Sequence, residues 1–122
     1  SMKTWIIVGS LLAAIAVLLG AFGTHFLKNR ISPEDLNIFN TGIRYHMYHA
    51  LALVLIGLLG FYYSSEIVLL PAILLTIGVF IFSGSLYFLV LTGSRWLGAI
   101  TPIGGLSLIV GWILLAFRIA KA

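Results

Sequence analysis

The sequence has no cysteine and very few charged residues. The absence of cysteine from all 122 residues excludes disulfides, thiolate metal ligands and thiol redox chemistry. Charged residues make up 8% of the chain, whereas soluble domains carry roughly 25%. Hydrophobic residues make up 61%, and the mean hydropathy is +1.18. We therefore predict a single integral membrane domain over residues 2–122, and we interpret Ser1 as an addition ahead of Met2.

Acidic residues are rarer than basic ones. The 3 acids, Glu34, Asp35 and Glu66, all fall in predicted turns or at a predicted helix start. A transporter driven by protons or cations needs a carboxylate at membrane depth, and the sequence offers none there. The 7 basic residues are scattered over ends and loops. We expect them to anchor helices at the lipid bilayer, with anionic headgroups rather than nucleic acid as their partners.

Four long apolar runs predict an all-α fold, a four-helix transmembrane bundle. Each run is long enough to cross a hydrocarbon core of roughly 30 Å. Within the fourth run, Pro102 predicts a kink. The predicted spans cover about residues 5–27, 43–62, 67–91 and 97–117.

The second helix is expected to begin before its span. Ser32 supplies a capping hydroxyl, Pro33 suits the first helical position, and the two acids that follow favour the positive end of the helix dipole. Residues 33–42 therefore form an amphipathic, interfacial extension at the start of the second helix. Gly42 is the expected position of a bend.

Small residues recur at three- and four-residue steps in the first span and cluster in the last two. Such residues let neighbouring helices approach closely, and they are also compatible with a homo-oligomer. The predicted packing positions are Gly9, Ala13, Ala16, Gly20, Gly84, Gly104, Gly105 and Gly111.

Polar and aromatic residues gather where the second span begins. The candidate ligand-binding residues are His25, Arg44, Tyr45, Tyr48 and His49. One interpretation is an interfacial belt, in which tyrosines lie at headgroup depth and arginine reaches for lipid phosphate. The other is that some of these side chains turn inward and hold a ligand, as ionisable groups in membrane segments commonly do.

The residues permit little catalytic chemistry. His46 and His49 could approach a metal with His25, but the pair points about 60° apart on a helical wheel and no acid completes the set. Ser83 and Ser85 could act as nucleophiles beside a histidine base, although such hydroxyls usually bond to backbone or across helices. We predict no metal, no cofactor and no catalytic residue.

Four ordered motifs resemble a known family. These are Gly20–His25, Arg44-Tyr45 with Tyr48–Ala52, Phe82–Tyr87, and Leu97–Pro102 with Gly104-Gly105 and Gly111-Trp112. Together they resemble domain of unknown function 423, also labelled uncharacterised protein family 0382. The resemblance implies a small four-span protein of the bacterial inner membrane and no established activity. Thr24 and His46 stand where alanine and glutamine are usual in that family. The second difference weakens the metal hypothesis, because an amide would be an odd replacement for a metal ligand.

Three functional hypotheses remain open. The first is a non-enzymatic packing or accessory protein whose polar end binds lipid headgroups or a small anion. The alternative is a small transporter or channel, alone or as an oligomer. The third is a membrane-embedded enzyme acting on lipid or peptide, which would need a hydroxyl activated by His25 or His49.

Overall fold

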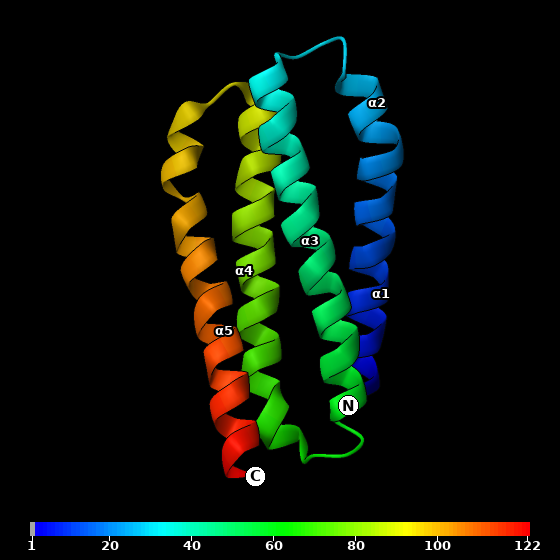
Figure 1. The fold of residues 1–122 in the computed structure, drawn as a ribbon, viewed down its shortest axis with the longest axis vertical. Helices are drawn as coiled ribbons and strands as arrows, with labels where there is room; N and C mark the ends of the chain where they lie inside the picture. The colour runs from blue at the N-terminus through cyan, green and yellow to red at the C-terminus, as the bar shows by residue number, and fades with distance from the viewer. Residues whose placement is uncertain (1) are drawn as a thin grey trace.

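Four long helices run up and down in the computed structural model, which describes residues 2–122; Ser1 lies outside the described residues. Figure 1 shows the helices, and no strand occurs in the described part of the chain. The elements are α1 (Met2–Leu18), a π-helical turn (Leu19–Gly23), α2 (Thr24–Leu27), α3 (Pro33–Leu59), α4 (Ser65–Thr92), a 3-10 turn (Arg95–Ala99) and α5 (Thr101–Lys121). The four apolar spans Met2–Leu27, Pro33–Leu59, Ser65–Thr92 and Arg95–Lys121 confirm the all-α, four-span prediction.

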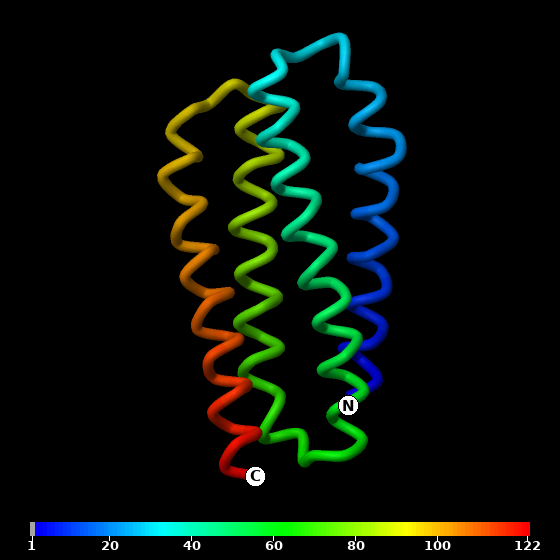
Figure 2. The backbone as a smooth tube through the Cα atoms, viewed as in Figure 1, coloured from blue at the N-terminus to red at the C-terminus, as the bar shows by residue number. Residues whose placement is uncertain are grey.

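The helices stand in an open row. The principal contacts join α1 to α3, α3 to α4, and α4 to α5, so that α1 and α5 form the two edges. Figure 2 shows both edge helices well apart, with α3 and α4 between them. Within the most apolar stretch of each span, 44% of α3 and 39% of α4 are buried, against 17% for the first span and 22% for the last. The edges and both faces of the row therefore offer apolar surface to lipid.

The start of α3 follows the predicted chemistry. The Ser32 hydroxyl accepts a hydrogen bond from the backbone N–H of Asp35 at 3.1 Å, and Pro33 occupies the first turn. The apolar face of the 33–42 segment is covered by protein: Phe39 is only 3% exposed and its ring lies 5.4 Å from that of Tyr87. This segment is thus an unbroken part of α3 that packs on α4, while its position relative to the headgroups stays a prediction.

Pro102 does not interrupt the last helix. The kink or free carbonyls expected from Pro102 correspond to a change of helix type just before it, where the 3-10 turn Arg95–Ala99 ends and α5 starts at Thr101. Pro102 then lies in the first turn, where the missing amide N–H would have had no helical partner anyway.

Gly42 is a close-contact position within a helix that continues through it. A Cβ atom there would lie 2.8 Å from Cε1 of Tyr87 on α4. Since carbon atoms normally approach to about 3.5 Å, only glycine fits without a shift of the neighbour. The smallness of the residue, rather than its backbone freedom, explains its place here.

Some of the predicted small residues lie in close contact with a neighbouring helix, and others do not. A Cβ at Gly9 would lie 2.6 Å from the carbonyl oxygen of Ala50 on α3, and Ala16 is 1% exposed. Between α4 and α5, Gly111 would meet Leu75 at 2.9 Å, and Gly104 abuts the backbone of Phe82.

The other predicted positions are less tightly packed. Gly20 and Gly105 would make ordinary contacts at 3.7 Å, and Ala13 is partly buried. Gly84 would meet no atom within 4 Å, so it lies outside the close helix contacts because its Cα faces a groove rather than a neighbouring helix. Close approaches that were not predicted occur at Gly57 against Ile6 and at Gly78 against Leu108.

Candidate functional site

The depth of the polar residues follows from helix geometry. A hydrocarbon core of roughly 30 Å covers about 20 helical residues. If its lower boundary lies at Gly60, beside the aromatic turn Tyr62-Tyr63, its upper boundary falls near Asn40 of α3. Arg44 then lies about one turn inside the core and His49 about 13 Å inside it, close to the midplane. Polar groups at that depth must find their partners within the protein.

His49 is buried and both of its ring nitrogens are bonded. His49 is only 5% exposed. The indole N–H of Trp112 on α5 lies 3.0 Å from Nε2, and Nδ1 lies 2.7 Å from the backbone carbonyl of Tyr45. An indole can only donate and a carbonyl can only accept, so Nε2 is the acceptor and Nδ1 carries the proton. His49 is therefore held as one neutral tautomer that ties α3 to α5.

His46 points to the other side of α3. Its Nδ1 lies 2.8 Å from the hydroxyl of Tyr87, and its buried Nε2 has no hydrogen-bond partner among residues 2–122. The ring lines a small cavity of about 210 Å³ between α1 and α4, whose walls also include Leu12 and Val79. Because His46 and His49 face different helices, the two rings do not form a shared metal site.

The two partly exposed tyrosines of α3 lie beside His49. Tyr45 is 40% exposed and Tyr48 is 56% exposed. The Tyr45 ring stacks on His49 at 6.3 Å and contacts the Phe82 ring of α4 at 4.7 Å. Tyr45, His49 and Phe82, but not Tyr48, line a second cavity of about 380 Å³ with residues of α5. This cavity lies between α3 and α5, whereas the first lies between α1 and α4. The cavity walls are Tyr45, His49, Phe82, Gly105, Leu108, Ile109 and Trp112.

The remaining predicted residues lie elsewhere. Arg44 is exposed and donates to the Thr41 hydroxyl at 3.1 Å. His25 is exposed on α2, next to the edge of the row opposite α5. Across residues 2–122, no hydrogen bond or ring contact joins His25 or Arg44 to His49. The structure brings Tyr45, Tyr48 and His49 together and leaves His25 and Arg44 apart from them.

A recess at the α2 end contains residues that sequence reasoning did not select. It has a volume of about 640 Å³ and is lined by Phe22, Gly23, His25, Phe26, Asn29 and Arg30. Arg30 donates to the carbonyl of Phe26 at 2.7 Å, and its guanidinium lies 4.0 Å from the Phe26 ring centroid. The alternation of aromatic and polar residues along this helix end could have predicted an amphipathic surface here.

The α2 end is joined to α3 by a short polar link. The π-helical turn Leu19–Gly23 precedes Thr24, whose hydroxyl donates to the side-chain oxygen of Asn40 at 3.0 Å. A π turn inserts one extra residue into the helix and re-aims the side chains that follow it. This link therefore sets the orientation of the recess relative to α3.

The serines that could have been nucleophiles are used in helix contacts. The Ser83 hydroxyl donates to the carbonyl of Gly42 at 2.7 Å, and Ser85 lies 2.6 Å from the Thr101 hydroxyl. Within residues 2–122 neither hydroxyl forms a hydrogen bond with a histidine ring nitrogen, and both stabilise helix pairs, α3 with α4 and α4 with the start of α5. This arrangement gives the enzyme hypothesis no activated hydroxyl among these groups.

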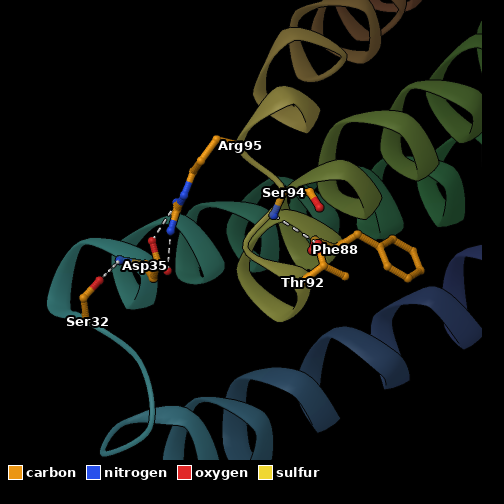
Figure 3. Close-up of polar contacts among 6 residues, drawn as sticks. All are labelled: Ser32, Asp35, Phe88, Thr92, Ser94 and Arg95. Atoms are coloured by element: carbon orange, nitrogen blue, oxygen red, sulfur yellow. Dashed lines mark hydrogen bonds and ion pairs between the residues drawn. The ribbon is translucent and has the colours of Figure 1, made fainter.

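An ion pair joins the start of α3 to the loop after α4. Figure 3 shows Arg95 reaching across to Asp35, with both guanidinium nitrogens 2.9 Å from the carboxylate oxygens. Asp35 lies in the first turn of α3, above the expected hydrocarbon boundary. The hydrogen bonds from Arg95 lower the pKa of the Asp35 carboxyl below its ordinary value of 3.8. The pair fixes the loop after α4 to the start of α3.

Four apolar helices with apolar side chains exposed along them define a multi-pass membrane protein. The chain belongs to the family described as "Protein of unknown function (DUF423)", which matches residues 19–105. It is 47% identical over 120 residues to a UPF0382 membrane protein of Staphylococcus epidermidis, and 43% identical over 121 residues to UPF0382 membrane protein YwdK of Bacillus subtilis. Each comparison covers 98% of both chains, and no solved structure matches. The predicted family is confirmed.

Proposed function

We propose that this protein is a non-enzymatic accessory protein of the bacterial cell membrane that binds anionic lipid headgroups at its α2 end. The observation that carries this proposal is the recess formed by α2 and the residues that follow it. It is a shallow, open surface, in which the exposed rings of Phe22 and Phe26 give apolar sides and His25, Asn29 and Arg30 supply polar groups. A phospholipid has the same order of parts, with acyl chains next to a charged headgroup.

The charges of the recess favour an anion. Arg30 is held over the Phe26 ring, and no acidic side chain lines the recess. The depression at the opposite end of the row carries two cations, Arg118 and Lys121, with Lys121 over the Phe117 ring at 4.8 Å, but Glu66 also lines it. Of these two recesses, only the first therefore offers a lipid phosphate a cation with no acidic side chain beside it.

Arg44 supports the same conclusion from a separate position. It is exposed about one turn inside the expected hydrocarbon boundary, and its hydrogen-bond partner is the neutral Thr41 hydroxyl. A cation at this depth lowers its free energy by reaching up toward lipid phosphate. We treat it as a second lipid contact, independent of the recess.

Lipid retention tests the proposal. The protein and its Arg30→Ala variant are purified from the same membranes, and phosphatidylglycerol per protein is measured by mass spectrometry. We expect the variant to lose several-fold of its retained phosphatidylglycerol, because one charge-assisted contact contributes roughly 1.5–3 kcal/mol. Lys121→Ala is the matched control, since it removes one cation from an aromatic ring at the other end. Equal retention by all three proteins would refute the proposal.

The orientation is part of the proposal. Anionic lipids give the cytoplasmic leaflet its negative potential, so we place the α2 end on the cytoplasmic side. The absence of native cysteine allows a direct test with single cysteines at Asn29 and Ser64, in loops at opposite ends. An impermeant maleimide added to intact cells should label the Ser64→Cys protein and leave Asn29→Cys unlabelled. The reverse pattern would contradict this orientation.

A further inference from the structure

We infer that the cavity between α3 and α5 is a binding site for a lipid-soluble quinone, a flat ring that carries carbonyl oxygens. This site is separate from the α2 recess and does not depend on it. The cavity holds about 380 Å³, within the roughly 300–1,000 Å³ range of small-molecule sites. The cavity between α1 and α4, at about 210 Å³, lies below that range.

Three aromatic rings from three different helices form the walls. Tyr45 comes from α3, Phe82 from α4 and Trp112 from α5. Gly105 adds no side chain to the α5 wall, and a Cβ there would lie 3.7 Å from the Phe82 ring. Aromatic faces around such a space favour a flat ring, which they can contact by offset stacking or edge to face.

The rings are held in place before any ligand arrives. Trp112 is fixed by its hydrogen bond to His49, and Tyr45 is held between His49 and Phe82. The polar atoms of His49 and the indole are therefore already used, and the cavity presents ring faces. A preorganised wall of this kind loses little side-chain entropy when a ligand binds.

One hydrogen-bonding group on the wall remains free. Within residues 2–122 the Tyr45 hydroxyl makes no hydrogen bond, whereas the Tyr87 hydroxyl contacts His46. A phenol donates readily to a carbonyl oxygen. A ring bearing carbonyl groups satisfies this donor, and a saturated acyl chain does not.

The position of the cavity sets the solubility of the ligand. Tyr45 lies about 7 Å below the expected hydrocarbon boundary and His49 deeper. Tyr45 and Trp112 remain 40% and 43% exposed on the surface that faces lipid. The ligand must therefore enter sideways from the hydrocarbon layer, which excludes charged and water-soluble ring compounds and fits a quinone with an apolar tail.

Quenching of Trp112 fluorescence tests this site. Trp5→Phe and Trp96→Phe leave Trp112 as the single tryptophan of the chain. In nanodiscs of neutral lipid, a short-chain quinone should quench Trp112 saturably, with an endpoint near one quinone per protein. A matched protein that retains only Trp96, which lies in the 3-10 turn, should show quenching that rises linearly with the quinone in the bilayer.

Two cavity variants separate binding from folding. Gly105→Leu fills the cavity and should abolish the saturable phase, whereas Gly105→Ala, whose Cβ makes only an ordinary contact, should retain it. Tyr45→Phe keeps the ring and should weaken quinone binding about fivefold, the usual effect of one lost hydrogen bond.

Three results would overturn the inference. Linear quenching of Trp112, the same as that of Trp96, would show that no site exists. A saturable phase that survives Gly105→Leu would place the quinone elsewhere. Relief of the saturable Trp112 quenching by palmitate added at the same concentration as the quinone would show that the cavity accepts acyl chains without recognising a ring.

Discussion

The hydrogen bond between Trp112 and His49 offers the sharpest test of how α5 is held to the rest of the row. The indole N–H of Trp112, which can only donate, lies 3.0 Å from Nε2 of His49. The other ring nitrogen of His49, Nδ1, is already bonded to the backbone carbonyl of Tyr45. The His49→Phe substitution keeps a ring of similar size but leaves the indole N–H without a partner. In lipid no water replaces it, so we expect a loss of about 1–3 kcal/mol of unfolding free energy.

A double-mutant cycle isolates the bond itself. His49→Phe, Trp112→Phe and the double variant are unfolded reversibly in mixed detergent and SDS micelles, followed by helical circular dichroism. Hydrogen bonds between membrane helices contribute about 0.6 kcal/mol on average and up to about 1.7, and the burial of His49, which is 5% exposed, places this one in the upper half of that range. We therefore expect a coupling energy of about 1–1.7 kcal/mol.

A second cycle gives the control. Trp96 lies in the 3-10 turn and makes no hydrogen bond to His49, so the Trp96→Phe and His49→Phe effects should add. Nitrogen NMR of labelled protein should show His49 protonated at Nδ1 only. A coupling below about 0.3 kcal/mol, or a proton on Nε2, would refute the reasoning from donors and acceptors.

Three further predictions concern other contacts. Gly9→Ala should destabilise the protein by about 1–2 kcal/mol in the same assay, because its Cβ would lie 2.6 Å from a carbonyl oxygen, whereas Gly84→Ala, with open space, should be neutral or stabilising. Ser83→Ala should cost about 1 kcal/mol, since it removes a fully buried hydroxyl bonded across two helices. Asp35 has a lowered pKa beside Arg95, so its stabilisation is complete above its ordinary value of 3.8 and is lost as pH falls through the lowered value. The melting temperatures of wild type and Asp35→Asn should thus differ at pH 6 and converge toward pH 2; a gap that stays constant would exclude this ion pair as the cause.

The local features of the chain were predictable because they depend on neighbouring residues. The Ser32 cap and Pro33 start α3 as expected, and the four apolar runs become four spans. Pro102 was the exception. Its ring suits the first turn of a helix and is disfavoured in the interior, and the sequence around it did not show that the preceding turn would be 3-10.

The partners of the polar residues were not predictable in the same way. His46 and His49 are three residues apart on one helix, yet one contacts Tyr87 on α4 and the other Trp112 on α5. Trp112 lies 63 residues from His49 in sequence, and nothing local to either residue selects the other. The proposed grouping of His25 and Arg44 with His49 depended on shared depth alone, which says nothing about which side of α3 a residue faces.

Hydropathy, charge scarcity and helix caps were enough to establish a four-span membrane protein, because each acts over one or two turns of a single helix. The order of the helices in an open row, the tautomer of His49 and the two cavities between different helices came only from the tertiary structure. In lipid every apolar helix face is equally soluble, so hydrophobicity does not choose between faces. Close fit at residues such as Gly9 and the pairing of buried polar groups make that choice, and both depend on side chains brought from distant parts of the chain.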